Sequence, residues 1–87
     1  KQREASPFIY KTLMQAKEHF NDQSVEDVVH FVEQEFAGKE QLELEYFEIA
    51  HAATLAHTTH KKPDEKYRAF IAVFAGDVRL IDNIALN

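Results

Sequence analysis

Apolar side chains recur every three to four positions through the first 40 residues, which is the spacing of amphipathic helices. The first helix is expected over residues 3–21. Its apolar positions fall on one side of a 3.6-residue period: Ala5, Phe8, Ile9, Leu13, Ala16 and Phe20. Pro7 has no N–H to donate within a helix, so we expect the regular helix to begin near Ser6. The polar residues 21–23 then form a turn.

A second helix is predicted to begin at Ser24. Ser24 and Asp27 have the spacing at which a side-chain hydroxyl accepts the N–H of the third helical residue. The apolar stripe of this helix consists of Val25, Val28, Val29, Val32 and Phe36. Gly38 is expected to end the helix in a left-handed conformation. Because the turn between the two helices is short, they should pack antiparallel.

Alternation replaces the helical period after residue 41. Leu42, Leu44 and Tyr46 alternate with Glu43 and Glu45, which predicts a half-buried strand with its glutamates on the solvent face. The alternation breaks at residues 47–49, so we expect a bulge or the end of the strand near Phe47. Residues 51–64 are polar and irregular, with a short helical turn predicted over residues 52–55.

Two further strands are predicted over residues 67–74 and 78–84. The Gly76-Asp77 pair between them suits a two-residue hairpin turn, because glycine readily adopts the positive φ required at the first turn position. The order of elements is therefore α-α-β-β-β. Helices that precede strands predict an α+β fold, in which a helical pair covers one face of a three-stranded antiparallel sheet.

Composition narrows the classes of partner. A chain of 87 residues with 45% hydrophobic and 29% charged residues is expected to fold as one globular domain. Its formal net charge of −5 opposes binding to nucleic acid, and no run of apolar residues is long enough to cross a membrane. The absence of cysteine agrees with a cytoplasmic location. A first residue that is not methionine suggests a piece of a longer protein.

Histidine offers the first candidate chemistry. His51, His57 and His60 lie in the polar loop, and the i, i+3 spacing of the last two would allow both imidazoles to reach one cation. No HExxH motif and no cysteine support such a site, so we expect solvated loop histidines and no metal. His19 and His30 are expected at the surfaces of the two helices. The loop lysines Lys61 and Lys62 are expected to be solvated.

Tyr10 and Met14 lie one turn apart on the flank of the first apolar stripe. Two interpretations are open for this pair. The side chains either complete the edge of the core of this domain or form a surface that another domain covers.

The last predicted strand contains three polar residues, Arg79, Asp82 and Asn83. Strand alternation puts Asp82 on the opposite face from the other two. The interpretation from the residues alone is structural: Arg79 pairs with an acid such as Glu45, and Asp82 accepts buried backbone amides.

At this strand the chain resembles the pantothenate synthetases, which are pantoate–β-alanine ligases. The resemblance is based on Asp77-Val78-Arg79-Leu80-Ile81-Asp82-Asn83-Ile84 at the end of the chain. Three further segments resemble the same family in the same order: Gln2-Arg3-Glu4-Ala5-Ser6-Pro7 with Tyr10 and Leu13, Leu42-Glu43-Leu44-Glu45-Tyr46-Phe47-Glu48-Ile49, and Thr54-Leu55. The similarity covers essentially the whole chain.

The resemblance implies that residues 1–87 are a single C-terminal lid domain, without the nucleotide-binding domain of the parent enzyme. Enzymes of the family use Mg-ATP to adenylate pantoate and then transfer the pantoyl group to β-alanine. Their HxGH-type signature and Ser-Ser-Arg-Asn hinge motif are absent from this sequence. The resemblance therefore implies no catalytic residue here and no cofactor bound by the fragment alone. Arg79, Asp82 and Asn83 are the candidates for contact with nucleotide.

Three functions from different classes follow. The first is the lid domain of an ATP-dependent ligase, inactive by itself and partnered by the nucleotide-binding domain of the same chain, with pantoate and β-alanine as substrates. The second is a small interaction module that uses its helical face. The third is a metal-binding loop that depends on His57.

Overall fold

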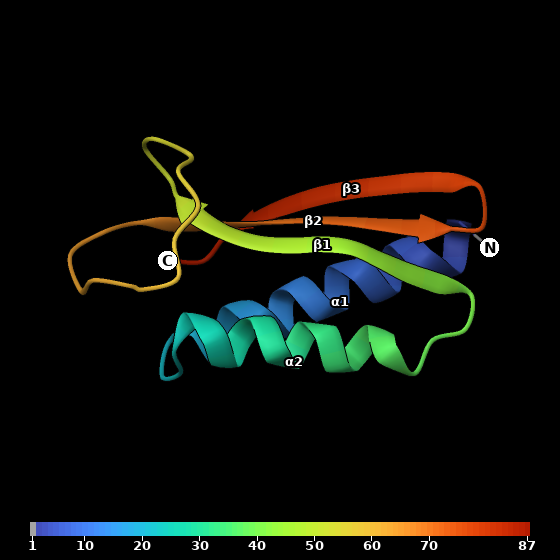
Figure 1. The fold of residues 1–87 in the computed structure, drawn as a ribbon, viewed down its shortest axis with the longest axis horizontal. Coiled ribbons are helices and arrows are strands. Elements are labelled where there is room, and N and C mark those ends of the chain that lie inside the picture. The colour runs from blue at the N-terminus through green and yellow to red at the C-terminus, as the bar shows by residue number, and fades with distance from the viewer. Residues whose placement is uncertain (1) are drawn as a thin grey trace.

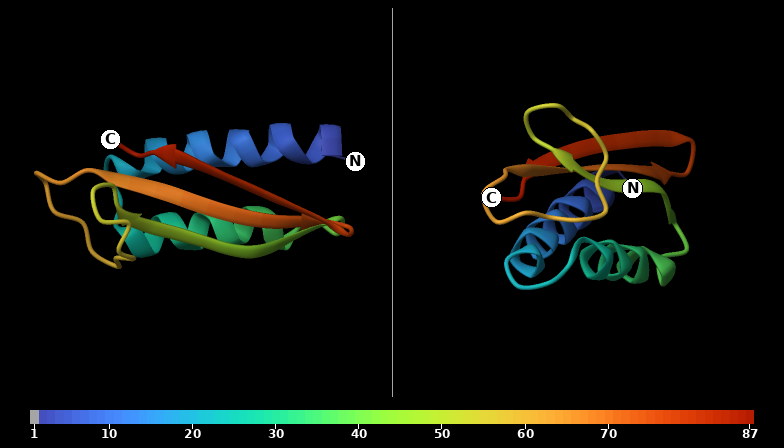
Figure 2. Two further views of the ribbon diagram at one scale, coloured as in Figure 1. Left: turned by 90° about the horizontal axis from the view of Figure 1, so that it is seen from above. Right: turned by 60° about the vertical axis from the view of Figure 1, so that its left-hand side comes forward.

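The computed structural model describes the backbone of residues 2–87 and the side chains of residues 7–87. Two helices, α1 (Gln2–Phe20) and α2 (Val25–Ala37), are followed by the strands β1 (Leu42–His51), β2 (Tyr67–Ala75) and β3 (Val78–Ala85). The strands form one antiparallel sheet in the order β1-β2-β3. Figure 1 shows antiparallel helices, and Figure 2 shows both of them on the same face of the sheet. The predicted α+β fold is confirmed.

The start of α1 corrects one expectation. The helix begins at Gln2 rather than near Ser6, so Pro7 lies inside it. The four residues before Ser6 include good helix formers, and a proline close to a helix end removes only one hydrogen bond from the ladder. The side chain of Ala5, predicted on the apolar stripe, lies outside the described residues.

The sequence prediction is confirmed at the start of α2 and is wrong in one respect at its end. The hydroxyl Oγ of Ser24 accepts the backbone N–H of Asp27 at 3.1 Å, so the predicted cap is confirmed. Gly38 follows the last helical residue as predicted, but its φ is −88° and not left-handed. The helix ends instead in a turn in which Lys39 donates its backbone N–H to the carbonyl of Phe36 at 3.0 Å.

Strand β1 contains a bulge as predicted, but at Glu45 and not at Phe47. Leu44 pairs with Val73 and Tyr46 pairs with Ala72, so Glu45 is an extra residue in β1 and forms a bulge. The strand continues through the bulge to His51. The expectation that Tyr46 shares a face with Leu42 and Leu44 is wrong, because the extra residue shifts Tyr46 to the outer face, away from the helices.

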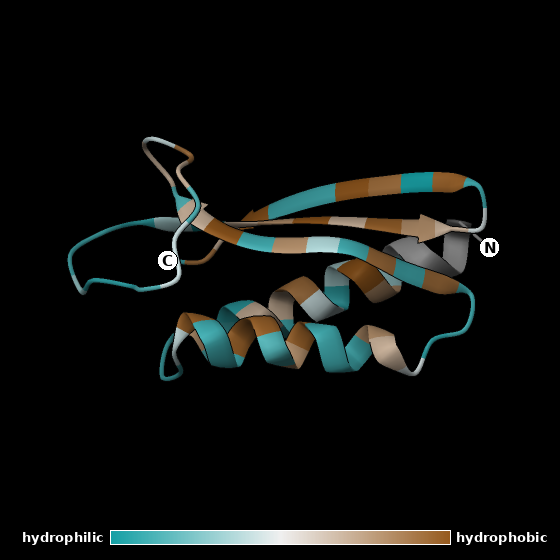
Figure 3. Cartoon of the chain, viewed as in Figure 1, coloured by the Kyte–Doolittle hydropathy of each residue, from teal (hydrophilic) through white to brown (hydrophobic). Residues whose placement is uncertain are grey.

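The core lies between the helical pair and the sheet. Helix α1 contacts β3 and β2, whereas α2 contacts β1. Figure 3 shows hydrophobic residues on the sides of the helices that face the strands. The fully buried side chains from both layers include Leu13, Val28, Val32, Ile49, Tyr67, Ile71 and Val73.

Removing the ring of Phe36 tests this core. Phe36 is 4% exposed, and its ring packs edge-on against Phe8 with centroids 5.1 Å apart. Phe36→Ala should lower the free energy of unfolding by about 3–5 kcal/mol, because it removes apolar contacts and leaves a cavity. Ile81, which is 65% exposed, is the control, and Ile81→Ala should cost no more than about 1 kcal/mol. Equal denaturation midpoints for the two variants would contradict the core assignment.

The two glycines give a matched pair for backbone conformation. Gly76 has a φ of +63° as the first residue of the β2–β3 turn, whereas Gly38 has an ordinary negative φ. No atom lies within 4 Å of a Cβ added at either position. Gly76→Ala should therefore cost about 1–2 kcal/mol from left-handed strain, and Gly38→Ala should stabilise by about 0.4–1 kcal/mol. In urea denaturation, the free energy of unfolding should fall for Gly76→Ala and rise for Gly38→Ala.

Candidate functional site on the sheet

The three candidate residues of β3 lie on two different faces of the sheet. Arg79 pairs with Phe74 and Asn83 pairs with Phe70, on the outer face that the helices do not cover. Asp82 pairs with the buried Ile71 and so lies on the helix side of the sheet. The predicted alternation is confirmed, and the three side chains do not converge on one point.

Arg79 forms an ion pair with Glu45 across the middle strand. Its Nε lies 2.6 Å from Oε1 of Glu45, and its Nη2 donates to Oε2 at 3.3 Å. The hydrogen bond to Glu45 and the charge of that carboxylate raise the pKa of Arg79. The partner proposed from the sequence is therefore confirmed. Glu45 thus accepts hydrogen bonds from both Nε and Nη2 of Arg79.

Asn83 is held by a residue that the sequence interpretation missed. Nη1 of Arg68 donates to Oδ1 of Asn83 at 2.5 Å. Arg68 pairs with Ala85 in the hairpin register, which makes Asn83 its diagonal neighbour on the same face. The Gly76-Asp77 turn already fixes this register, so the hairpin prediction contained the information needed to find Arg68.

Asp82 accepts a backbone amide, but the amide is not buried. Its Oδ1 accepts the N–H of Asn83 at 2.8 Å, and both residues are exposed on β3, an edge strand. The expectation that Asp82 holds buried donors is wrong in this respect, because the sheet ends at β3 and water reaches the amide. Asp82 instead covers a free N–H of an edge strand, which hinders the addition of another strand.

Because Asp82 is exposed, we expect Asp82→Asn to change stability little. An asparagine keeps the Oδ1 acceptor, and exposed substitutions rarely change stability by more than about 0.5 kcal/mol. We expect the variant to unfold within about 0.5 kcal/mol of the original protein, measured by urea denaturation. Asp82→Ala, which removes the acceptor, is the comparison. A loss of several kcal/mol in the asparagine variant would show that water does not reach this carboxylate.

Lys61, in the loop between β1 and β2, is not solvated as expected. Its Nζ donates to the carbonyl of Phe20 and, at 2.6 Å, to the carbonyl of Gln23, at the end of α1. The ammonium also lies 4.5 Å from the centroid of the Phe20 ring. A cation at the C-terminus of a helix offsets the partial negative charge of its last carbonyls. Lys61 therefore holds the loop against α1 and is not simply solvated.

The loop histidines do not form a cluster. Nδ1 of His51 lies 2.8 Å from Oε1 of Glu65, in a pocket of about 560 Å³ that Lys62 and Lys66 also line. His57 and His60 are exposed. Among the side chains that the structure describes, no three histidines, cysteines or carboxylates gather closely enough to hold a metal ion.

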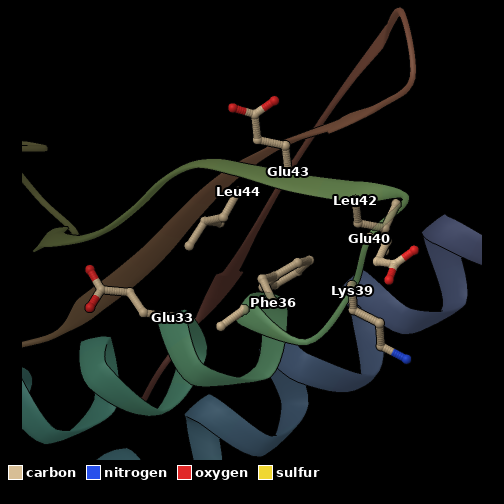
Figure 4. Close-up of a pocket in the computed structure, with 8 residues that line it drawn as sticks. Glu33, Phe36, Lys39, Glu40, Leu42, Glu43 and Leu44 are labelled. Atoms are coloured by element: carbon tan, nitrogen blue, oxygen red, sulfur yellow. The ribbon is translucent and has the colours of Figure 1, made fainter.

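A second pocket, of about 390 Å³, opens between the end of α2 and β1 (Figure 4). Phe36, Leu42 and Leu44 form its apolar floor. Glu33 and Glu43 also line it, but Figure 4 shows their carboxylates pointing away from each other. The pocket therefore offers an apolar floor, and Glu33 and Glu43 are not positioned as an acid–base pair.

Comparison with known proteins decides the family. The family model described as pantoate-beta-alanine ligase matches residues 1–85. The chain belongs to the pantoate–β-alanine ligase family. It is 45% identical over 85 residues to the pantothenate synthetase of Christiangramia forsetii and 44% identical over 86 residues to that of Flavobacterium psychrophilum. The resemblance inferred from the terminal motif is therefore confirmed.

The match to the ligase family covers only part of each relative. The match to the C. forsetii enzyme includes 98% of this chain but only about 30% of the length of that enzyme. A crystal structure of pantothenate synthetase from Thermus thermophilus shares the fold, with a TM-score of 0.80 and 23% identity, and again 30% of that chain is covered. The homology is to the C-terminal part of these ligases. None of the described helices is long and apolar enough to cross a membrane.

Proposed function

We propose that residues 1–87 form the C-terminal lid domain of an ATP-dependent ligase that joins pantoate to β-alanine. The observation that supports this proposal is the family match over residues 1–85, together with 45% identity to a pantothenate synthetase. In the proposed reaction, the pantoate carboxylate displaces pyrophosphate from ATP to give pantoyl-adenylate. The amine of β-alanine then displaces AMP and forms the amide.

The proposed contribution of this domain is to exclude water. An acyl-adenylate hydrolyses if water reaches it before the amine does, and a closing lid prevents that loss. The described polar groups of β3 agree with a supporting role, since Arg79 contacts Glu45 and Asn83 contacts Arg68. No nucleophile, acid or base is assigned to this chain.

ATP and Mg²⁺ are proposed to bind mainly in the remaining part of the ligase. The described side chains contain no group of three metal ligands, so they offer no all-protein cation site, and a Mg²⁺ ion that accompanies ATP would be held largely by phosphate oxygens and water. The partner of the lid is then the nucleotide-binding domain of the same polypeptide. Because pantoate, β-alanine and ATP are small soluble molecules, we also propose that the enzyme works in the cytoplasm.

The alternative of a helical-face interaction module has less support. Apart from Ala37 at its end, the exposed positions of α2 are polar and include Glu26, His30 and Glu33, which does not favour apolar docking. Exposed apolar side chains are found on α1 at Tyr10 and Met14. A surface of this kind also suits contact with another domain of the same ligase.

A domain replacement tests the proposed function. The C-terminal part of the C. forsetii pantothenate synthetase is replaced by residues 1–87, and AMP formation is measured with ATP, Mg²⁺, pantoate and β-alanine. We expect AMP release that depends on both pantoate and β-alanine, within about tenfold of the parent rate, which is about 1.4 kcal/mol of barrier. The truncated enzyme without any lid and residues 1–87 alone should form no pantothenate.

Two controls make the outcome interpretable. The fusion carrying Phe36→Ala has a destabilised lid and should lose activity on warming before the unaltered fusion does. Calorimetric ATP binding to the fusion shows whether the nucleotide-binding part is intact. A fusion that is folded, binds ATP and still forms no pantothenate would contradict the proposed function.

A further inference from the structure

Five large apolar side chains are exposed among the described residues: Tyr10, Met14, Leu55, Val78 and Ile81. Tyr10 and Met14 lie on α1, and Val78 is the first residue of β3, the strand that α1 packs against. Leu55 lies in the loop after β1, and Ile81 lies on the outer face of the sheet. We define the α1–β3 edge as Tyr10, Met14, Val78 and the exposed Asp82.

The helical period places Tyr10 and Met14 on the free flank of α1. Phe8 and His19 lie on the flank that faces α2, where they contact the rings of Phe36 and Phe31. At 100° per residue, Tyr10 and Met14 fall on the opposite flank, away from α2. Since α1 packs beneath β3 and α2 beneath β1, this flank lies at the side of the molecule where the sheet ends.

The core of this domain does not use the α1–β3 edge. Tyr10 is 58% exposed and Met14 is 38% exposed, so the interpretation that they complete the core is wrong for Tyr10. Ile9 and Leu13, their neighbours in sequence, supply the buried side of the same helix. Tyrosine and methionine are enriched where proteins bind one another, because tyrosine offers a large rigid ring and methionine a flexible apolar side chain.

The chemistry of the edge indicates how a partner would bind. Asp82 covers the N–H of Asn83 on the free side of β3, which hinders pairing with an added strand. Tyr10 and Met14 instead offer side chains for packing. A suitable partner is therefore a folded surface that is apolar opposite α1 and carries N–H donors or a basic side chain near Asp82.

We propose that the α1–β3 edge is the surface on which the rest of the ligase polypeptide docks. The identity of this partner rests on the proposed function. The chain covers 30% of its relatives and corresponds to their C-terminal part, so the remaining length of the ligase joins at the start of α1. Figures 1 and 2 show the start of α1 at the same end of the molecule as the β2–β3 turn, next to which Val78 lies.

Cysteine labelling tests this docking directly, because the chain has no cysteine of its own. Single variants Tyr10→Cys and Met14→Cys report on the α1–β3 edge. Ile81→Cys, on the outer face, and Leu55→Cys, in the loop, are matched controls that are at least as exposed in the isolated chain. Each is labelled with a maleimide in residues 1–87 alone and in the C. forsetii fusion, whose other cysteines are replaced by serine.

We expect both edge variants to react at least about tenfold more slowly in the fusion than in the isolated domain, because docking covers them. The two controls should react within about twofold of their isolated rates. Equal rates at Met14→Cys in the two proteins, or protection of Ile81→Cys in place of the edge, would overturn the proposal. Protection of the edge that depends on concentration in the isolated domain would also overturn it, by assigning the surface to a second copy.

Failure of this proposal is distinguishable from failure of the proposed function. A fusion that forms pantothenate while its edge variants label freely would leave the function intact and refute the docking surface. A folded fusion that protects the edge and forms no pantothenate would refute the function and leave the docking surface intact.

Discussion

The extra residue in β1 determines which side chains of that strand face the helices. Leu44 and Tyr46, on either side of Glu45, pair with consecutive residues of β2. Strict alternation from Leu44 would have turned Phe47 and Ile49 toward the outer face. The bulge buries both instead, and each buried side chain of this size contributes about 1.5–3 kcal/mol. The contact between the sheet and α2 depends on this shift.

The same bulge shapes the outer face of the sheet. It leaves Glu45 on the solvent side, where its carboxylate contacts Arg79 across β2. An exposed ion pair of this kind adds little stability, so its main effect is on where the two side chains lie. Ala72 is fully buried although no helix covers it, because Tyr46 and Ile81 lie beside it on the neighbouring strands. The sheet therefore has a packed core on the face that the helices cover and a shallow apolar layer around Ala72 on its outer face.

The sequence predicted the elements well because their periods are distinct and their ends carry specific residues. Ser24 and Gly76 acted as expected, since a cap and a positive-φ turn depend on one residue each. The position of the bulge was harder to predict, because alternating residues do not reveal which one lacks a partner. The contact of Lys61 was missed because it joins segments that only the folded chain brings together, whereas the contact of Arg68 with Asn83 followed from the predicted hairpin register.

The exposed apolar residues agree with the proposed lid, which would dock on the rest of the ligase and release from it. The domain has a core of its own, in which Phe36 and Leu13 are buried. A permanent interface usually buries well over about 1,000 Å² of surface. The α1–β3 edge presents only a few apolar side chains around Tyr10 and Met14, which favours a contact between domains that can open. A lid has the same requirement, because a contact too weak would admit water and one too strong would retain the product.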